Sequence, residues 1–244
     1  MNESLGDPFV VHRDETEHVH IHMGENATLR KMDIELPGEQ PLWVERSTLP
    51  EGPTRPALVL IHGFAQNRFS WDTEIRSMSA WLAVRGWDVW NLELRGHGRS
   101  RRRGGAKATT FSDYPNDLIR LAEAMPTPAF WIGHSLGASV AYAAVAQRPE
   151  APPTSGVVGI AGLYRFGQAG WILPFVSRIT RKIPIALNLG DIQVHTGLSG
   201  RVMARLFPFV DMAAYGMPIA GWWPGSVEPE LAKERMRRGF DYIP

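Results

Sequence analysis

The chain begins with a region in which apolar and polar residues alternate. A period of two is typical of strands that expose one face, as in antiparallel sheets. The turn-forming segment 37–41 separates two of the alternating stretches, so we expect short antiparallel strands joined by turns. The expected strands are 17–23, 28–36 and 42–47.

Farther along the chain, continuous apolar runs alternate with segments whose apolar residues recur at helical spacing. A continuous apolar run is typical of a strand that is buried on both faces of a parallel sheet. Between two such runs, Trp71, Ile75, Met78 and Leu82 recur at intervals of three and four, which predicts a helix that ends before Gly86. This alternation predicts right-handed crossovers and a mostly parallel sheet. The expected buried strands are 57–61, 87–94, 129–133 and 156–160, and two further expected helices are 114–125 and 136–147.

After Gly162 the alternation of strands and helices ends. Residues 163–240 are rich in Trp, Phe, Met, Pro and Arg, and no clear strand pattern appears in them. Short helices are expected at 199–207 and 229–238. We therefore divide the chain into three expected regions. They are an amino-terminal extension with an edge strand (1–27), an α/β core (28–162) and a helical cap or lid (163–244).

Composition narrows the class of protein. Hydrophobic residues make up 44% of the chain and charged residues 21%, as in ordinary globular proteins. The 26 Lys and Arg residues and 25 Asp and Glu residues nearly cancel, which gives no electrostatic reason to expect nucleic-acid binding. The absence of cysteine excludes disulfides, cysteine nucleophiles and cysteine zinc sites. No signal peptide and no apolar stretch of about 18 residues is visible, so we expect a cytoplasmic protein without a transmembrane segment, cofactor or metal.

One short motif carries candidate chemistry. The segment Gly133-His134-Ser135-Leu136-Gly137 matches the pattern G-x-S-x-G between an expected strand and an expected Ala-rich helix. In that setting the pattern forms a sharp turn that exposes the serine, and the glycines let neighbouring backbone pass close by. We therefore predict that Ser135 is a nucleophile and that the N–H of Leu136 faces a developing oxyanion. The alternative is a glycine-rich turn with an incidental serine.

A second motif, His62-Gly63-Phe64, directly follows the expected strand 57–61. Acyl transfer needs a second N–H donor to the oxyanion, which usually comes from the loop after this strand. We predict that the backbone N–H of Phe64 is this donor. His62 is expected to brace the loop through hydrogen bonds rather than to act as a base.

These motifs and the run LELRGHGRS at 92–100 resemble the α/β-hydrolase superfamily, particularly its bacterial lipase and esterase-like members. Those proteins carry HGF, a loop written D-x-R-G-H-G-x-S, and GHSLG in this order. The resemblance covers about residues 28–162. It implies an α/β-hydrolase fold, which has a mostly parallel sheet, flanking helices and a helical cap. It also implies hydrolysis of ester or lipid-like substrates through an acyl-enzyme on Ser135.

A serine hydrolase of this family needs an acid and a histidine after the nucleophile. Within the 244 residues, the only histidine after Ser135 is His195, which lies inside the expected cap. Asp191 is too close to His195 to form the usual pair, and Asp211 and Asp241 follow no recognisable strand. We expect that the chain stops before the last core strands, because a natural sheet seldom leaves such a raw edge. Alternatively, the chain is complete and has lost hydrolysis, or it uses His195 in an unusual way.

Three further groups of residues have two possible interpretations each. The basic run from Arg95 to Arg103 could bind phosphate or nucleic acid, but a solvated loop is favoured because no aromatic residues are interleaved. His18, His20 and His22 would share one strand face and could bind a metal, but an exposed edge strand is favoured. An aromatic set in the cap could line an acyl pocket or form ordinary core, and both interpretations stay open. It comprises Trp171, Phe175, Phe207, Phe209, Trp222 and Trp223.

The sequence therefore predicts an enzyme that hydrolyses a small-molecule ester or acyl substrate. Acyl transfer to an alcohol or amine would use the same residues, and peroxidase or thioesterase activity is also compatible with them. A different class, a non-catalytic relative that binds a small apolar ligand, follows from the lack of a conventional late histidine. Nucleic-acid binding is disfavoured by the near-neutral charge.

Overall fold

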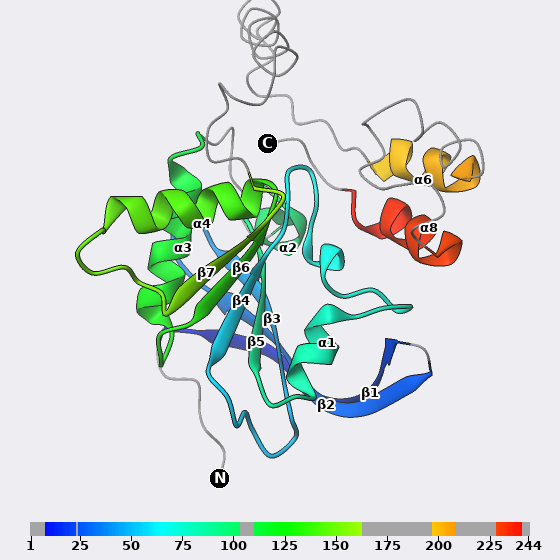
Figure 1. Ribbon diagram of the computed structural model, residues 1–244, viewed down its shortest axis with the longest axis horizontal. Helices are drawn as coiled ribbons and strands as arrows, with labels where there is room; N and C mark the ends of the chain where they lie inside the picture. Colours follow the sequence, from blue (N-terminus) through cyan, green and yellow to red (C-terminus); the bar gives the residue numbers. More distant parts are fainter. Residues whose placement is uncertain (1–7, 23, 103–109, 163–196, 208–227, 241–244) are drawn as a thin grey trace, which may run out of the picture.

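A single seven-stranded sheet, with the strand order β1-β2-β3-β5-β4-β6-β7, organises the fold (Figure 1). The computed structural model describes residues 8–22, 24–102, 110–162, 197–207 and 228–240. The strands are β1 (Val10–His22), β2 (Glu25–Leu36), β3 (Leu42–Thr48), β4 (Ala57–Ile61), β5 (Asp88–Glu93), β6 (Phe130–His134) and β7 (Gly156–Ile160). The helices are η1 (Arg68–Ser70), α1 (Met78–Ala83), α2 (Gly98–Arg102), α3 (Asp113–Ala124), α4 (Leu136–Gln147), α6 (Gly197–Arg205) and α8 (Pro229–Arg238).

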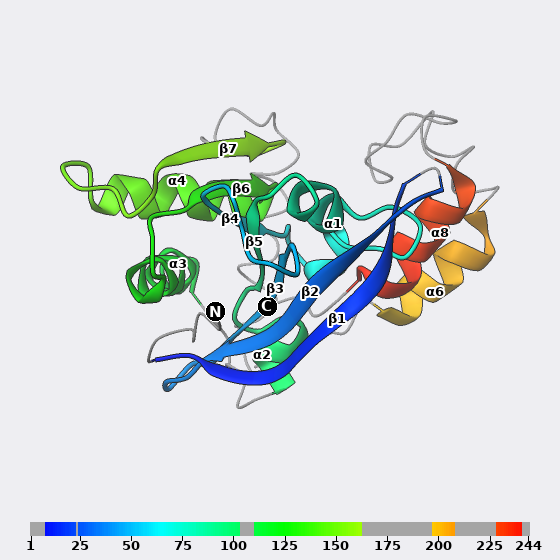
Figure 2. The same ribbon diagram turned by 90° about the horizontal axis from the view of Figure 1, so that it is seen from below.

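The sheet has an antiparallel part and a parallel part. β1, β2, β3 and β5 pair antiparallel in succession, whereas β5, β4, β6 and β7 pair parallel. Figure 2 shows the first two strands as a long curved hairpin at the antiparallel edge. The predicted mostly parallel sheet with flanking helices is thereby confirmed.

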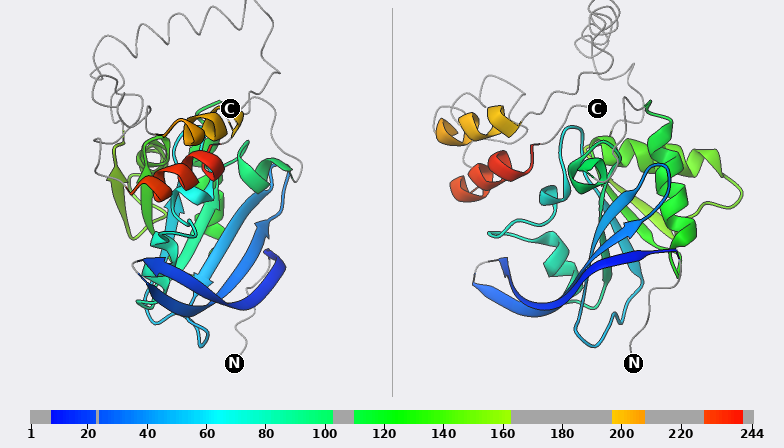
Figure 3. Two further views of the ribbon diagram at one scale, coloured as in Figure 1. Left: turned by 90° about the vertical axis from the view of Figure 1, so that its right-hand side faces the viewer. Right: turned by 180° about the vertical axis from the view of Figure 1, so that it is seen from behind.

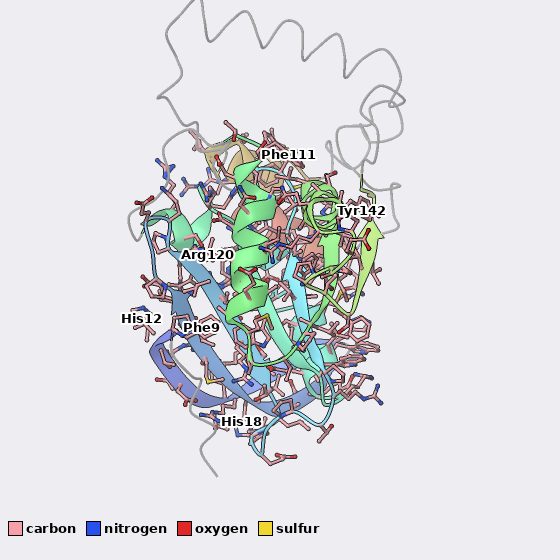
Figure 4. All side chains as sticks on the ribbon, turned by 90° about the vertical axis from the view of Figure 1, so that its left-hand side faces the viewer. Phe9, His12, His18, Phe111, Arg120 and Tyr142 are labelled. Carbon is pink, nitrogen blue, oxygen red and sulfur yellow. The ribbon has the colours of Figure 1, made fainter. Side chains whose placement is uncertain are left out.

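The two faces of β4 explain why its sequence is continuously apolar. Val59 and Ile61 face a core that α3 and α4 cover, whereas Leu58 and Leu60 face a second core that includes α1. Since side chains alternate along a strand, a strand between two helical layers needs apolar residues at every position. Figure 4 shows α3 and α4 together over the first face, with Arg120 and Tyr142 labelled.

The first strand is longer than its apolar pattern predicts, since β1 begins at Val10 rather than at residue 17. Its polar residues have partners on β2. The guanidinium of Arg30 donates to both carboxylate oxygens of Asp14, at 2.7 and 2.5 Å, and Arg13 Nε donates to Asp33 at 2.9 Å. Ion pairs across the two strands therefore take the place of an alternating apolar face.

The predicted helix from Trp71 to Leu82 is wrong over its first half. η1 and an irregular segment precede α1, which starts only after Ser77. The Ser77 hydroxyl accepts a hydrogen bond from the N–H of Ala80 at 2.9 Å, so it caps the helix. Trp71 is buried in the second core without being part of a helix, and Ile75 is only partly buried, so their helical spacing does not reflect a continuous helix.

The basic run after β5 is also more ordered than a solvated loop, within the part that the structure describes. Arg95 donates to both carboxylate oxygens of Asp117, at 2.5 and 2.6 Å. Arg99 lies in α2 and pairs with Asp33 at 2.7 Å. These two arginines therefore hold the loop to α3 and β2.

A second helical unit, α6 with α8, lies beside η1 and away from α3 and α4 (Figure 3). Its small core consists of Ala204, Phe207, Ala232 and Met236. Phe207 is thus a core residue, whereas the other five members of the aromatic set lie outside the described residues. The α8 bounds agree with the predicted helix 229–238.

A cluster of buried charges joins the antiparallel strands to the segment before α1. Lys31 on β2 lies 2.6 Å from Asp72 and 3.2 Å from Glu45 on β3, beside a pocket of about 360 Å³. Burial raises the pKa of Glu45 to about 7, since Lys31 offsets only part of this cost and Asp72 adds a second negative charge. Burial also acts on Asp72, but the Lys31 charge lowers the pKa of Asp72 to about 2.

The raised pKa of Glu45 predicts that the stability of the fold falls as the pH rises from about 4.5 to about 7. Its folded pKa lies above its unfolded value, so its contribution is complete below about pH 4.5 and is lost as the pH rises through about 7. Glu45→Gln mimics the protonated carboxyl and does not titrate. Between about pH 6 and 8.5, the free energy of unfolding of this variant should therefore fall less than that of the parent protein. Each unit of difference between the folded and unfolded pKa of Glu45 corresponds to about 1.4 kcal/mol. Urea unfolding at both pH values measures this. The exposed Glu51→Gln is the control, and equal pH dependence in all three proteins would contradict the account.

Candidate active site

Ser135 sits on a sharp turn between β6 and α4. Its backbone has φ 51° and ψ −113°, a conformation that residues other than glycine rarely adopt and that costs about 1–3 kcal/mol. Neighbouring groups maintain it: the N–H of Ser135 donates to the carbonyl of Ile160 on β7 at 2.8 Å, and the Ser139 hydroxyl donates to the carbonyl of Ser135 at 3.4 Å. Strain of this kind, at a partly buried turn between a strand and a helix, matches a nucleophile elbow.

Two glycines allow this turn to pack against the end of β4. A Cβ on Gly137 would lie 2.3 Å from the carbonyl oxygen of Ile61, and one on Gly133 would lie 2.5 Å from the backbone nitrogen of Ala138. Neither contact is sterically possible, so both positions require glycine. The backbone of Gly137, in the first turn of α4, thereby lies against the carboxyl end of β4.

His62 joins the loop after β4 to the end of β5. It is fully buried, its Nε2 accepts from the N–H of Leu94 at 3.1 Å, and its Nδ1 lies 2.9 Å from the carbonyl oxygen of Gly63. Burial, and then the adjacent His97, lowers the pKa of His62 well below its usual value. A neutral His62 with both ring nitrogens engaged holds the loop in place and has no lone pair left for Ser135.

The turn after His62 carries Phe64. The Gln66 side chain accepts hydrogen bonds from the N–H of Gly63 at 3.2 Å and from the Ser70 hydroxyl at 2.9 Å. Ala65 adopts φ 52°, and the Phe64 side chain is 51% exposed. This tight turn therefore exposes the phenylalanine at the surface next to the elbow.

His134 lies between the elbow and that turn. A Cβ on Gly63 would be 3.0 Å from Nδ1 of His134, and the imidazole meets the edge of Trp71 at 6.4 Å between ring centres. Burial, and then the charge of Arg235, lowers the pKa of His134. The two predicted motifs, HGF and GHSLG, are thus in contact.

The sequence did not indicate the roles of Gln66 and Asn67. Gln66 holds the Phe64 turn, and Asn67 caps η1 by accepting from the N–H of Phe69 at 3.1 Å. An Asn before a short polar segment is a capping signal, but it is too common to mark a site.

Several predicted candidates lie outside the described residues, namely Asp191, His195, Asp211 and Asp241. On β1, His18 lies 2.9 Å from the Thr28 hydroxyl, and His20 lies 3.1 Å from the Asn26 side-chain oxygen. Among the described residues, no three or more His, Asp or Glu side chains gather in a way that could hold a metal. Likewise, no described helix is long and apolar enough to cross a membrane.

The sequence matches the family described as "Alpha/beta hydrolase family" over residues 58–237. The chain belongs to this family. It is 33% identical over 107 residues to epoxide hydrolase B of Mycobacterium tuberculosis H37Rv, which covers 43% of this chain and 28% of that protein. It is also 33% identical over 119 residues to a pimeloyl-[acyl-carrier protein] methyl ester esterase of Methylococcus capsulatus, covering 48% and 41%. The matched parts therefore span less than half of either relative.

Among solved structures, the thioesterase domain from the curacin biosynthetic pathway is similar in fold. It has a TM-score of 0.51 and 16% sequence identity, and the match covers 93% of this chain and 66% of that one. The similarity extends over most of this α/β hydrolase and supports its fold.

The tight packing of the elbow predicts a large effect of one added methyl group. In Gly137→Ala the new Cβ would collide with backbone, so we expect a loss of about 3 kcal/mol in the free energy of unfolding. Gly96→Ala is the matched control, since Gly96 has φ 75° but no atom within 4 Å of a Cβ, and it should lose about 1 kcal/mol. Urea unfolding of both variants tests this. A loss at Gly137 no greater than that at Gly96 would show that the elbow is loosely packed.

Proposed function

We propose that this α/β hydrolase is a serine hydrolase that cleaves small-molecule carboxylic esters or lipid-like esters through an acyl-enzyme on Ser135. The strained backbone of Ser135 carries the proposal, together with the contacts that its neighbours His134 and Gly137 make with the loop that bears Phe64. A hydroxyl at such a turn is exposed to substrate, while the helix start and the neighbouring loop supply backbone N–H groups.

The reaction has two steps. The Ser135 oxygen attacks the acyl carbon while a base takes its proton, and the carbonyl oxygen becomes an oxyanion that accepts from the N–H groups of Phe64 and Leu136. The carbonyl re-forms as the alcohol leaves with that proton. Water then attacks the acyl-enzyme in the same way and releases the carboxylic acid and Ser135.

The residue at the elbow favours esters over the epoxides that the names of some relatives indicate. If Ser135 opened an epoxide, the product would be an ether, which water does not readily cleave. A serine that attacks an acyl carbon instead forms an ester, which water can hydrolyse to complete the turnover. The esterase relatives are thus the better guide to substrate chemistry.

The proton acceptor for Ser135 is not His62, whose two ring nitrogens are both engaged. His195 is the only histidine after Ser135 within the 244 residues, and it stays one of two alternatives for this role, beside a histidine that follows the last core strands.

The proposal predicts covalent labelling of one serine. A fluorophosphonate probe should modify Ser135 of the parent protein and not Ser135→Ala, as mass spectrometry of the peptides would show. Hydrolysis of a short-chain p-nitrophenyl ester should fall by about 10³-fold or more in that variant. The exposed Ser112→Ala serves as the control and should react like the parent protein.

The same experiment separates the alternatives. A parent protein that neither reacts with the probe nor hydrolyses esters, yet binds apolar acyl compounds, would be a ligand-binding relative and would contradict the proposal. A labelled Ser135 whose acyl group passes to added alcohol rather than to water would mark an acyltransferase.

A further inference from the structure

α8 and the turn that bears Phe64 are joined through one side chain. The Asn67 amide nitrogen donates to the carbonyl oxygen of Arg238, at the end of α8, at 2.9 Å. The oxygen of the same amide accepts from the N–H of Phe69 in η1 at 3.1 Å. Asn67 thus spans two segments that are 171 residues apart in the chain.

A buried carboxylate makes a second connection between the same two segments. Glu234 of α8 accepts from the N–H of Glu74 at 2.8 Å and from the N–H of Ile75 at 3.2 Å. Both carboxylate oxygens are used, and the side chain is largely buried. Hydrogen bonds to a charged acceptor are among the stronger ones in proteins, so α8 is firmly attached to the segment between η1 and α1.

Residues of the sheet also hold η1 in place. Arg68 donates to Glu93 of β5 at 3.2 Å, and its carbonyl accepts from the Asn91 side chain at 3.1 Å. The guanidinium groups of Arg68 and Arg238 both lie over the Phe69 ring, at 4.4 and 4.2 Å from its centre. η1 therefore lies between the sheet and α8 and contacts both, as its place in Figure 1 also shows.

The residues that make these contacts lie close in the chain to the candidate oxyanion donor, the N–H of Phe64. Gln66, which holds the N–H of Gly63, directly precedes Asn67. Gln66 also accepts from Ser70, the last residue of η1. A shift of η1 would therefore be passed to the turn that presents the Phe64 N–H.

We propose that Asn67 is a positioning residue through which α8 fixes the orientation of the Phe64 N–H toward the oxyanion. The inference rests on the proposed serine-hydrolase function for its kinetic consequence only. An oxyanion donor acts mainly in the transition state, so a misplaced donor lowers kcat more than it changes KM.

Asn67→Asp tests this directly. The aspartate keeps an oxygen for the Phe69 N–H, loses the donor to Arg238, and places negative charge at the carbonyl end of α8. We expect kcat for ester hydrolysis to fall about tenfold, with KM within about twofold of the parent value. Hydrogen exchange read by mass spectrometry should become faster in peptides from 62–70 and 229–238 together.

Two further variants make the result decisive. Glu234→Gln can accept only one of the two N–H groups well and should give the same pattern in weaker form, which keeps the test usable if Asn67→Asp does not fold. Glu228→Gln removes an exposed ion pair to Arg76, between the same two segments, and should change neither kcat nor exchange.

The outcomes for the two proposals are distinguishable. Faster exchange confined to α8, or unchanged kcat with faster exchange in both peptides, would overturn the positioning role. If the parent protein hydrolyses no ester, the function fails, and the exchange data alone then show whether α8 holds the 62–70 turn.

Discussion

The parallel pairing of β4 with β6 is the constraint on which the candidate site depends. Ile61 pairs with Gly133, so the two strands end side by side and their following loops must share one small space. Gly137 then rests its backbone against the Ile61 carbonyl, which only glycine permits. The elbow and the HGF loop meet because the sheet brings them there, and the strain at Ser135 is sustained by the surrounding hydrogen bonds.

The loop after β4 also explains how the helical unit of α6 and α8 can matter for a site in the core. Its residues belong in turn to the His62 brace, the Phe64 turn and η1, and η1 contacts both the sheet and α8. The segment farther on ends in the charge cluster around Asp72. One continuous stretch of chain thus links the antiparallel strands, the candidate oxyanion hole and the second helical unit.

Much of the core could be predicted from the sequence because local signals and burial agreed there. The predicted bounds of α4 and β7 match the structure. A glycine-containing turn precedes α4, and prolines lie between α4 and β7, so local signals mark these bounds. The prediction of a helix from Trp71 was wrong over its first half, because apolar residues can have helical spacing in a segment that packs without being helical. The start of β1 was missed because cross-strand ion pairs leave no apolar pattern. The contacts of Asn67 and Glu234 join residues far apart in the chain, and no local pattern reports them.

In the proposed function, Ser135 and the backbone N–H groups of Phe64 and Leu136 form one acyl-transfer site. A crystal structure of the protein after reaction with an alkyl fluorophosphonate tests it most directly, because the phosphoryl oxygen mimics the oxyanion. We expect a bond from Ser135 to phosphorus and a phosphoryl oxygen about 2.7–3.1 Å from both nitrogens. An adduct on another residue, or an oxygen that turns away from both N–H groups, would contradict it.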